Sequence, residues 1–426
     1  MPDFNPDVLK SISILNENGH GAYIVGGAVR DYFLGCEIHD FDVVCDAKIE
    51  EIYEIFKDYK SKIYANNQCV SIKIGESRIE VAPIKGGSIE DDLTYRDYSI
   101  NSVAYAPELG FIDPYNGIAD LNNHILRTIR EPSEVFKKDP LRILRGIRFA
   151  ITKGLEIPAN LKAQFNQYAY LLDTVHPMRI GPELNAIMLS EKPSIYFYEY
   201  LDVFKRIIPE LEKCVGFDQK SKWHSHTVFD HLMVVLDSTE DDLALRFAAL
   251  FHDIKKPECF ITDDMGVGHF PNHYLVGANY AKELLIKYAY PTSLIEEVYR
   301  LVKYHDFRLE NATDYDIIGF LSEFGTRDID KLMKLQKADI KGQSPDLLYR
   351  VEKYSLIENK VHNVISKYKI YDYQKLAIKM KDLIDSGYSE INAKRKLIKL
   401  ASDIAIGKIK NEREYLKRYI RLREAN

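Results

Sequence analysis

Hydrophobic positions follow two different periods in the first part of the chain. Residues 7–18 carry them at helical spacing, whereas Ala22–Val25 is a short β-prone run that ends at the pair Gly26-Gly27. A second helix is predicted over Ala28–Leu34, and the alternation in Asp40–Val44 predicts a second strand. A strand, a glycine pair, a helix and a strand are therefore expected in close succession.

A hairpin is predicted further along this region. Residues 48–57 show a third helical pattern, and Val70–Ile74 and Arg78–Ile84 are β-prone runs on either side of Gly75-Glu76-Ser77. The first part of the chain is therefore expected to be mixed α/β with a small sheet.

From about residue 133 the hydrophobic pattern is almost wholly helical. Pro177, Pro182, Pro193 and Pro209 mark short turns between the expected helices. The sequence thus predicts an α+β fold in which a head with a small sheet precedes an all-α remainder.

The composition is typical of a soluble globular protein, since 46% of the 426 residues are hydrophobic and 29% are charged. At ~100–200 residues per domain, this length predicts two to four domains. No apolar run approaches the ~20 residues that a membrane helix needs, and the first residues do not resemble a secretory signal. The cysteines are widely spaced and form no C-x-x-C pair, which favours reduced thiols and a cytoplasmic location.

The net charge of -6 would by itself argue against a nucleic-acid partner, but the charge is unevenly distributed. Residues 391–426 contain 11 basic and four acidic residues, a local charge of +7, which leaves -13 for residues 1–390. Residues 124–148 contain seven basic and three acidic residues, a local charge of +4. Both basic segments are candidates for contact with phosphates.

Asp40 and Asp42 are candidate metal ligands. One residue separates them in the predicted second strand, so both carboxylates would project to the same side. Two negative charges this close are tolerated when a cation lies between them, and Mg²⁺ takes one or two carboxylates together with phosphates and water. Glu80, in the predicted hairpin, is a candidate third acidic group, and Gly26-Gly27 would let backbone amides approach a phosphate. Taken singly, each feature also has an ordinary structural explanation.

The glycine pair and the two aspartates, together with motifs that follow them along the chain, resemble in kind and order the motifs of the class II tRNA nucleotidyltransferases, the family of CCA-adding enzymes and bacterial poly(A) polymerases. Gly26–Asp31 together with Asp40–Asp42 resembles the first motif of this family, and Arg96–Asn101 resembles the second. The later matches, of which the last is fainter, are Asp113-Pro114…Gly117…Asp120-Leu121, Asp139–Arg145 and Arg179…Glu183. The resemblance covers roughly residues 20–190.

This resemblance implies a polymerase-β-like head with Asp40, Asp42 and Glu80 as catalytic residues. Asp40 and Asp42 would hold two Mg²⁺ ions while an RNA 3′-hydroxyl attacks the α-phosphate of CTP or ATP and pyrophosphate leaves. The nucleotide-binding residues that it implies are Gly26, Gly27, Arg30, Arg96, Asp97, Asn101, Asp139, Arg142, Arg145 and Arg148.

In this family, protein side chains select the base. On that pattern Asp139 and Arg142, three residues apart on one predicted helix face, would contact the Watson–Crick edge of the incoming nucleotide. The alternative is a solvated helix face on which Arg142, Arg145 and Arg148 merely lie on one side.

Two positions depart from the family pattern. Tyr95 stands where the second motif usually has an arginine, and Lys138 stands where the fourth usually has a glutamate. Because an arginine can bind a phosphate through two donors and a tyrosine cannot, these departures leave the nucleotide specificity open.

A second constellation lies in the helical region, where His252-Asp253 and its flanking residues resemble the motif of HD phosphohydrolases. A divalent transition metal there could lower the pKa of a bound water towards ~7 for attack on a phosphoester. Lys255 stands where a small residue is common, which leaves a weak activity open, and His224, His226 and His269 are expected to have structural roles. The candidate ligands are His231, His252, Asp253, His273, His305 and Asp339.

The sequence thus predicts a nucleotidyltransferase head over residues 1–132, a base-recognition neck over 133–205, an HD domain over 206–345 and a basic helical tail over 346–426. The predicted function is template-independent addition of CCA to tRNA 3′ ends from CTP and ATP, with phosphohydrolase activity in the HD domain. The alternatives are poly(A) addition, CC-only or A-only addition, and an HD phosphohydrolase whose head only binds RNA. No membrane partner is expected, and the oligomeric state is open.

Overall fold

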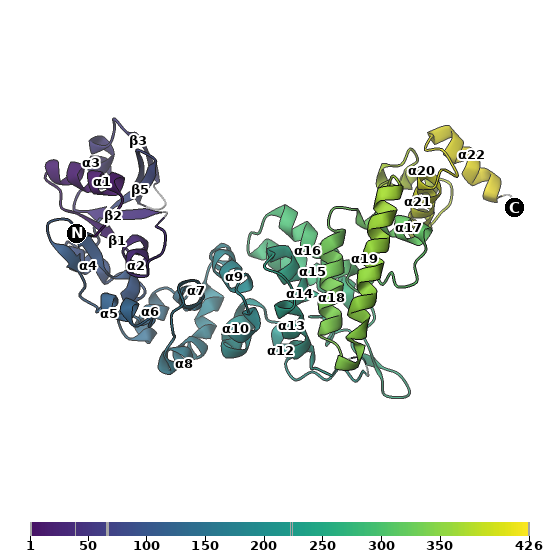
Figure 1. Cartoon of the computed structure of the whole chain (residues 1–426), viewed down its shortest axis with the longest axis horizontal. Coiled ribbons are helices and arrows are strands. Elements are labelled where there is room, and N and C mark those ends of the chain that lie inside the picture. The colour runs from purple at the N-terminus through teal and green to yellow at the C-terminus, as the bar shows by residue number, and fades with distance from the viewer. Residues whose placement is uncertain (1, 39, 65–67, 222, 224, 425–426) are drawn as a thin grey trace. The chain divides into compact units, whose positions relative to one another are not determined.

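The computed structural model describes residues 2–38, 40–64, 68–221, 223 and 225–424 (Figure 1). Two compact units are present. Met1–Ile187 and Tyr198–Ile207 form the first, and Met188–Phe197 and Ile208–Asn426 form the second. Over the described residues, no helix combines the length and the apolar character needed to cross a membrane.

A mixed sheet of seven strands, counted over the described residues, forms the start of the first unit, in the order β3-β4-β5-β2-β1-β6-β7. All neighbouring strands are antiparallel except β2 and β5, which are parallel. The strands span Ala22–Val25 (β1), Phe41–Cys45 (β2), Lys60–Tyr64 (β3), Cys69–Ile74 (β4), Ser77–Pro83 (β5), Ala104–Ala106 (β6) and Gly110–Ile112 (β7).

Alternate residues of the central strands belong to two different cores. Ile24 and Val43 lie in the larger core, which contains α1 (Pro6–Glu17), α2 (Gly27–Phe33) and α3 (Ile49–Ile55) (Figure 1). Val44 lies in a smaller core with α4 (Ile89–Leu93). Because residues two apart in a strand point to the same side, Asp42 shares the side of Val44, and Glu80 is its register partner on β5. The strand alternation therefore places both acidic groups on one side of the sheet.

The predicted helices and strands of this region are present, and their ends differ by no more than two residues from the prediction. The expected strand Asp40–Val44 begins instead at Phe41, so Asp40 precedes it. The pattern did not predict β3, β6 and β7. β3 is an edge strand that is mostly exposed, and β6 and β7 have three residues each, so none of them shows a clear alternation of apolar and polar residues.

Helices make up the remainder of the first unit. α7 carries three of the candidate arginines and contacts the buried ring of Tyr98, whose hydroxyl donates to the carbonyl of Arg142 at 2.6 Å. The shorter elements and helices are η1 (Ser99–Asn101), α5 (Gly117–Asn122), α6 (Pro132–Lys138), α7 (Arg142–Lys153), α8 (Ala159–Gln167), η2 (Ala169–Thr174), η3 (Pro177–Arg179) and α11 (Leu201–Ile207). Between them, α9 (Ile180–Met188) and α10 (Pro193–Glu199) pass from one unit to the other.

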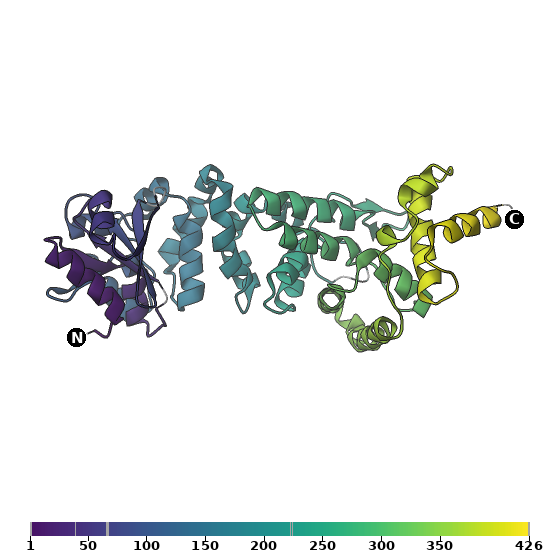
Figure 2. The same cartoon turned by 90° about the horizontal axis from the view of Figure 1, so that it is seen from above.

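The second unit is almost wholly helical, apart from a pair of two-residue strands, β8 (Ile261–Thr262) and β9 (Gly268–His269). α15 and α16 lie side by side in both views (Figure 1, Figure 2). A separate hydrophobic core forms near the C-terminal end from residues between Tyr373 and Ile420. The helices are α12 (Leu211–Cys214), α13 (Val228–Asp237), α14 (Leu243–Phe251), α15 (His273–Lys287), α16 (Thr292–Tyr304), α17 (Asp314–Phe324), α18 (Ile329–Lys341), η4 (Pro345–Leu347), α19 (Tyr349–Lys367), η5 (Tyr373–Lys375), α20 (Met380–Ile384), α21 (Glu390–Ala405) and α22 (Arg413–Glu424).

Candidate functional sites

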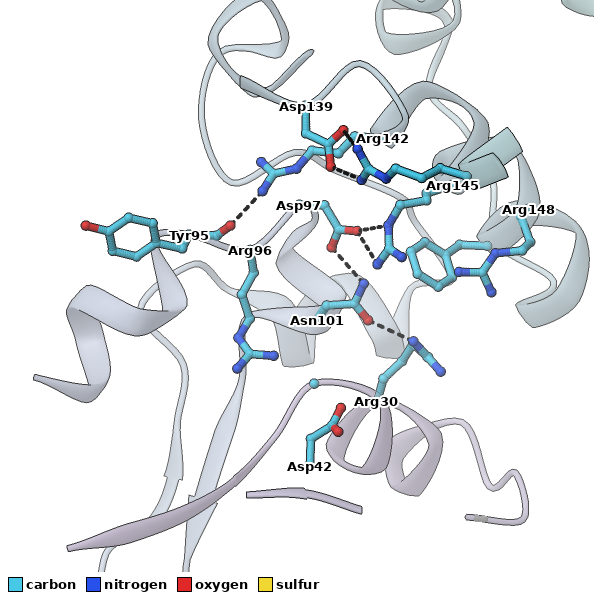
Figure 3. A pocket seen from close by; sticks show the side chains of 14 residues that line it. Arg30, Asp42, Tyr95, Arg96, Asp97, Asn101, Asp139, Arg142, Arg145 and Arg148 are labelled. Carbon is cyan, nitrogen blue, oxygen red and sulfur yellow. Dashed lines mark hydrogen bonds and ion pairs between the residues drawn. The ribbon is translucent and has the colours of Figure 1, made fainter. Parts of the chain in front are cut away.

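One cavity in the first unit brings together all the nucleotide-binding candidates. It has a volume of about 420 Å³ and lies between the ends of β1 and β2 and the helix α7 (Figure 3). Six arginines and three aspartates line it together with glycine, tyrosine, asparagine and phenylalanine residues. The excess of cationic groups suits an anionic ligand such as a triphosphate. Its lining residues are Gly26, Gly27, Arg30, Asp42, Tyr95, Arg96, Asp97, Asn101, Asp139, Arg142, Arg145, Arg148, Phe149 and Arg179.

Gly26 lies where the second motif closes against the first. Its φ of 68° lies in the left-handed region, and a Cβ at this position would lie 2.8 Å from Nη1 of Arg96. Arg96 also donates to Asp92 at 2.9 Å, and its buried Nε has no hydrogen-bond partner. The left-handed backbone therefore favours glycine at position 26, and a side chain there would displace the Arg96 guanidinium.

Asp42 borders two cavities. The second cavity, of about 290 Å³, is also lined by Glu80, Tyr95 and Arg96. Loss of solvation raises the pKa of Asp42. The Arg96 guanidinium opposes this shift, and the negative charges of Glu80 and Asp40 raise the pKa further. The carboxylates thus repel one another in part, and a hard cation would relieve this repulsion, so the donor set fits Mg²⁺.

Asp40 is placed less favourably than Asp42 for binding a metal ion at the cavity. It precedes β2, is exposed, and does not line either of these cavities. Among the described residues, the groups of three or more side chains whose potential ligand atoms all lie within 4.8 Å of one another are both in the second unit. Asp40, Asp42 and Glu80 are therefore neighbours that do not yet form a closed ligand set.

Asp97 is the centre of a hydrogen-bond network in the cavity wall. Its carboxylate accepts from Nε and Nη2 of Arg145 at 2.8 and 2.7 Å and from the Asn101 amide at 2.9 Å. Burial would raise the pKa of Asp97, but Arg145 and Asn101 outweigh burial and lower it. Asn101 in turn accepts from Arg30 at 2.8 Å (Figure 3). Asp97 thus holds other nucleotide-binding candidates in place, and its oxygens are already occupied.

Phe149 connects three of the cavity arginines. The guanidinium carbons of Arg30 and Arg145 both lie 5.2 Å from its ring centroid, and that of Arg148 lies at 4.3 Å. Arg148 also donates to Glu183 at 2.5 Å. The side chains of Arg145 and Arg148 are thus held by specific partners and are only partly exposed. Sequence reasoning missed Phe149, because an apolar residue in an amphipathic helix gives no separate signal.

Asp139 and Arg142 were expected on one helix face, but they do not lie in the same helix. α6 ends at Lys138, and α7 begins at Arg142, because Pro140 favours an extended residue before it and interrupts the helix at Asp139. Arg179 grips the Asp139 carboxylate through two hydrogen bonds of 3.1 and 2.7 Å. Arg142 donates to the carbonyl of Tyr95 at 2.6 Å (Figure 3). Both side chains still line the cavity, although tertiary contacts rather than helical spacing place them there.

The third motif has a structural part in this arrangement. The Asp113 carboxylate accepts from the backbone amides of Gly117 and Ile118 at 2.7 and 2.9 Å and so caps the start of α5. Asp120 accepts from the hydroxyl of Ser99 at 2.5 Å, and Ser99 begins the turn that presents Asn101. Asp113 thus stabilises α5, and Asp120 on this helix holds the turn that carries Asn101, a residue of the cavity wall.

The six metal-ligand candidates of the second unit converge, although they come from five separate segments. His231 lies on α13, His252 and Asp253 follow α14, His273 begins α15, His305 follows α16 and Asp339 lies on α18. All six side chains are buried. They form two groups that share Asp253, namely His231, His252, Asp253 and Asp339, and Asp253, His273 and His305.

The histidine rings are oriented by the backbone. In each ring Nδ1 lies 2.6–2.8 Å from a carbonyl oxygen, which can only accept, so Nδ1 carries a hydrogen and Nε2 faces the cluster. The Nε2 atoms of His231 and His252 are 3.0 Å apart. Two nitrogen lone pairs at this distance need a proton or a cation between them.

Asp253 gives an independent indication that the cluster fits a metal. Its Oδ2 lies 3.2 Å from Nε2 of His231, and its Oδ1 lies 3.2 Å from Nε2 of His273. Oδ1 is buried and has no hydrogen-bond partner of acceptable geometry. Burial opposes protonation of His231, but hydrogen bonds to Asp253 and Asp339 outweigh it and raise the pKa of His231 to about 9. Imidazole nitrogens and carboxylates together suit a divalent transition metal.

Lys255 does not obstruct the cluster. Its ammonium donates to Glu210 and Glu258 at 3.0 and 2.8 Å. Lys256 instead lies 2.6 Å from Oδ2 of Asp253 and borders a cavity of about 240 Å³ beside the cluster. Arg308, which donates to Asp339, borders the same cavity. The sequence did not single out Lys256 or Arg308, and the only local signal was the closeness of Lys256 to the His-Asp pair.

The remaining histidines fit the structural roles expected of them where they are described. His269 is exposed and pairs with Asp263 at 2.9 Å. The backbone carbonyl of His226 accepts from Gln219 at 3.2 Å. His224 lies outside the described residues.

Two protein-family models match the chain. Residues 22–127 match the poly A polymerase head domain, and residues 224–341 match the HD domain. Over these residues the chain is thus similar to a poly A polymerase head domain and to an HD domain. The resemblance to the tRNA nucleotidyltransferase and poly(A) polymerase family, first visible in the motifs, is confirmed.

Curated relatives carry related names. A CC-adding tRNA nucleotidyltransferase of Halalkalibacterium halodurans is 39% identical over 45% of this chain and 50% of its own length. A multifunctional CCA protein of Ralstonia nicotianae is 33% identical over 57% of this chain and 63% of its own length. An A-adding tRNA nucleotidyltransferase of Deinococcus radiodurans is 29% identical over 68% of this chain and 69% of its own length. The chain thus spans between half and two thirds of the length of the first two relatives.

Solved structures agree on the fold. The CCA-adding enzyme of Bacillus stearothermophilus in complex with CTP matches 99% of this chain and 98% of its own, with a TM-score of 0.63 and 18% identity. The Thermotoga maritima CCA-adding enzyme with tRNA matches 98% and 96%, with a TM-score of 0.61 and 20% identity. The predicted fold class, a polymerase-like head with a sheet followed by a helical HD body, is confirmed.

Proposed function

We propose that this protein is a tRNA nucleotidyltransferase that adds CMP and AMP to tRNA 3′ ends without a nucleic-acid template. The observation that carries the proposal is the single cavity in which Asp42, the cationic groups and the base-edge candidates Asp139 and Arg142 meet. The names of the three relatives support a tRNA substrate with CTP and ATP as nucleotide donors.

In the proposed reaction, the RNA 3′-hydroxyl attacks the α-phosphate of the nucleotide. A new phosphodiester forms, the bond between the α- and β-phosphates breaks, pyrophosphate leaves, and the hydroxyl proton passes to solvent. Asp42, with Asp40 and Glu80 beside it, would hold Mg²⁺, which activates the attacking oxygen and neutralises the leaving one. Arg30 and Arg96 would bind the triphosphate.

Base selection falls to Asp139 and Arg142 on this proposal. An aspartate accepts from the exocyclic amines of cytosine and adenine, and an arginine donates to ring and carbonyl acceptors. Arg179 holds the first of these side chains, and the carbonyl of Tyr95 holds the second. Two residues with fixed side chains can thus replace a template strand.

The number of nucleotides added is a separate question. We propose complete CCA addition, which agrees with the relatives named as multifunctional CCA proteins. CC-only addition is the second candidate, because the relative that is 39% identical carries that name.

For the HD region, we propose a metal-dependent phosphohydrolase. Its support is the buried cluster of four histidines and two aspartates with an unpartnered carboxylate oxygen. A transition metal held there would supply a water of lowered pKa, and Lys256 borders the adjacent cavity, where it can bind a phosphate. We also retain as proposals a cytoplasmic location and the division into head (1–132), neck (133–205), HD domain (206–345) and tail (346–426).

The test of the main proposal offers tRNAs that end before CCA, after the first C and after CC, with CTP or ATP supplied separately. Product lengths on a sequencing gel distinguish complete CCA, CC-only, A-only and poly(A) addition. With both nucleotides supplied together, complete addition is expected to give three, two or one added nucleotides on the three acceptors. The absence of any extension on all three acceptors with both nucleotides would overturn the proposal.

A further inference from the structure

The two positions that depart from the family pattern contact each other. The ammonium nitrogen of Lys138 lies 4.2 Å from the ring centroid of Tyr95, within the range of a cation–π contact. The two residues are far apart in sequence and belong to different motifs. Tyr95 follows α4, and Lys138 is the last residue of α6. Two unusual residues are thus joined by one direct interaction.

Each member of this pair adjoins one of the base-edge candidates. The backbone carbonyl of Tyr95 accepts from Nη2 of Arg142 at 2.6 Å. Lys138 ends α6 and immediately precedes Asp139, whose carboxylate is gripped by Arg179. A contact between Tyr95 and Lys138 therefore links the residue that holds Arg142 to the segment that carries Asp139.

The charges around Lys138 give the pair a further consequence. Partial burial lowers the pKa of Lys138, and Arg142, Arg130 and Lys85 lower it further. A glutamate at this position would attract these cations and compete with the Tyr95 carbonyl for the Arg142 guanidinium. With Lys138 resting on an aromatic ring, Arg142 keeps its bond to the Tyr95 carbonyl and still lines the nucleotide cavity.

We propose that Tyr95 and Lys138 form one positioning unit that holds Arg142 and Asp139 in the arrangement that selects the base of the incoming nucleoside triphosphate. This inference rests on the proposed nucleotidyltransferase function. The pair acts through Arg142 and Asp139, so it governs how well a nucleotide binds and which one binds more than it governs the chemical step.

A double-mutant cycle tests this coupling. Lys138→Glu removes the cation–π contact and draws Arg142 to a new carboxylate, and Tyr95→Arg removes the ring. Each single change is expected to raise the KM for CTP and ATP about tenfold and to alter the CTP-to-ATP preference, with little change in kcat. In the double variant the introduced arginine would pair with the introduced glutamate and spare Arg142, so KM is expected to return to within about threefold of wild type.

Three control variants separate positioning from a general structural effect. Lys137→Glu makes the same charge change one residue earlier on α6, at an exposed position, and is expected to leave KM within about twofold. Tyr95→Phe and Lys138→Arg keep the ring and the cation and are expected to behave like wild type. Thermal unfolding of every variant should match wild type.

The outcomes distinguish this inference from the proposed function. If the wild type extends tRNA but the two single effects simply add, the positioning unit is refuted and the function stands. If the wild type binds nucleotides without extending tRNA, the same cycle is read in the Kd for CTP and ATP, where coupling still supports the inference. If the wild type binds neither nucleotide, both proposals fail.

Discussion

Asp42 borders two cavities of the first unit, and among the three aspartates that line the nucleotide cavity it is the one that also borders the second. Its neighbour Asp40 stands outside the strand, and Glu80 reaches the same region through the parallel pairing of β2 and β5. A loss of charge at Asp42 should therefore affect catalysis more strongly than folding, since the side chain faces the cavities and packs little.

We predict that Asp42→Asn lowers incorporation of labelled CMP and AMP at least about 100-fold, because a carboxylate that holds the metal is lost. The free energy of unfolding should change by less than about 1 kcal/mol. Asp46→Asn, an exposed change at the end of the same strand, is the matched control and should keep full activity. Unchanged incorporation by Asp42→Asn would remove this residue from the reaction.

Asp97 allows a prediction on pH. Its folded pKa is lowered from 3.8, so its ion pair stabilises the fold fully above the unfolded value and loses this effect as the pH falls through the folded pKa. Asp97→Asn should destabilise the protein by roughly 1–3 kcal/mol at pH 7, because Arg145 loses its buried partner. Denaturant unfolding at pH 7 and below about pH 4 should show this difference shrinking as the pH falls. A constant difference would assign the effect to packing alone.

At the scale of elements, the position of α7 places Arg142, Arg145 and Arg148 at the cavity. Gly146 lies in the middle of this helix, and a Cβ there would come within 2.3 Å of the Tyr98 hydroxyl and 2.6 Å of the Phe165 ring. The helix can approach both buried rings only because this position has no side chain. The close approach also lets Tyr98 donate to the carbonyl of Arg142.

We predict that Gly146→Ala destabilises the protein despite the better helix propensity of alanine. The gain in propensity is about 1 kcal/mol, whereas overpacking against fixed rings costs roughly 1–3 kcal/mol and displaces α7. Displacement of Arg142 and Arg145 should also raise the KM for nucleotides, which steady-state kinetics would measure. Thr152→Ala, at an exposed position of the same helix, is the control. An unchanged melting temperature and KM for Gly146→Ala would contradict the close packing.

At the scale of the whole molecule, the two candidate sites lie in separate compact units. The side chains of the cavity and those of the buried cluster have no residue in common. Their proposed activities should therefore be separable by mutation.

His252→Ala is expected to spare nucleotide addition and to abolish metal-dependent release of phosphate from a phosphoester substrate. The metal content of the purified protein, measured by mass spectrometry, should fall as well. His252 is one of four side chains that could bind one ion together, and its loss would weaken metal binding by the other three. His362→Ala, which changes an exposed histidine of the same unit, is the matched control. If both activities fell together in a folded His252→Ala variant, the two sites would not be independent.

The basic segment 391–426 is less available to a nucleic acid than its charge of +7 indicates. Lys394 pairs with Glu323, Lys408 pairs with Asp403 at 3.2 Å, and Arg413 pairs with Asp382 at 2.6 Å. Part of this charge stabilises the C-terminal helices themselves, which the linear sequence could not reveal.

The sequence by itself determined the order of the first helices and of four strands in the head, the identity of most residues that line the cavity and the six side chains of the buried cluster. The elements follow from local periodicity, and the site residues were identified through the resemblance of short motifs to known families, neither of which depends on distant parts of the chain. The tertiary structure alone decided which partners those side chains take. It paired Asp97 with Arg145 and brought Tyr95 against Lys138. Each of these outcomes depends on contacts between residues remote in sequence, whose geometry is fixed only when the chain is packed.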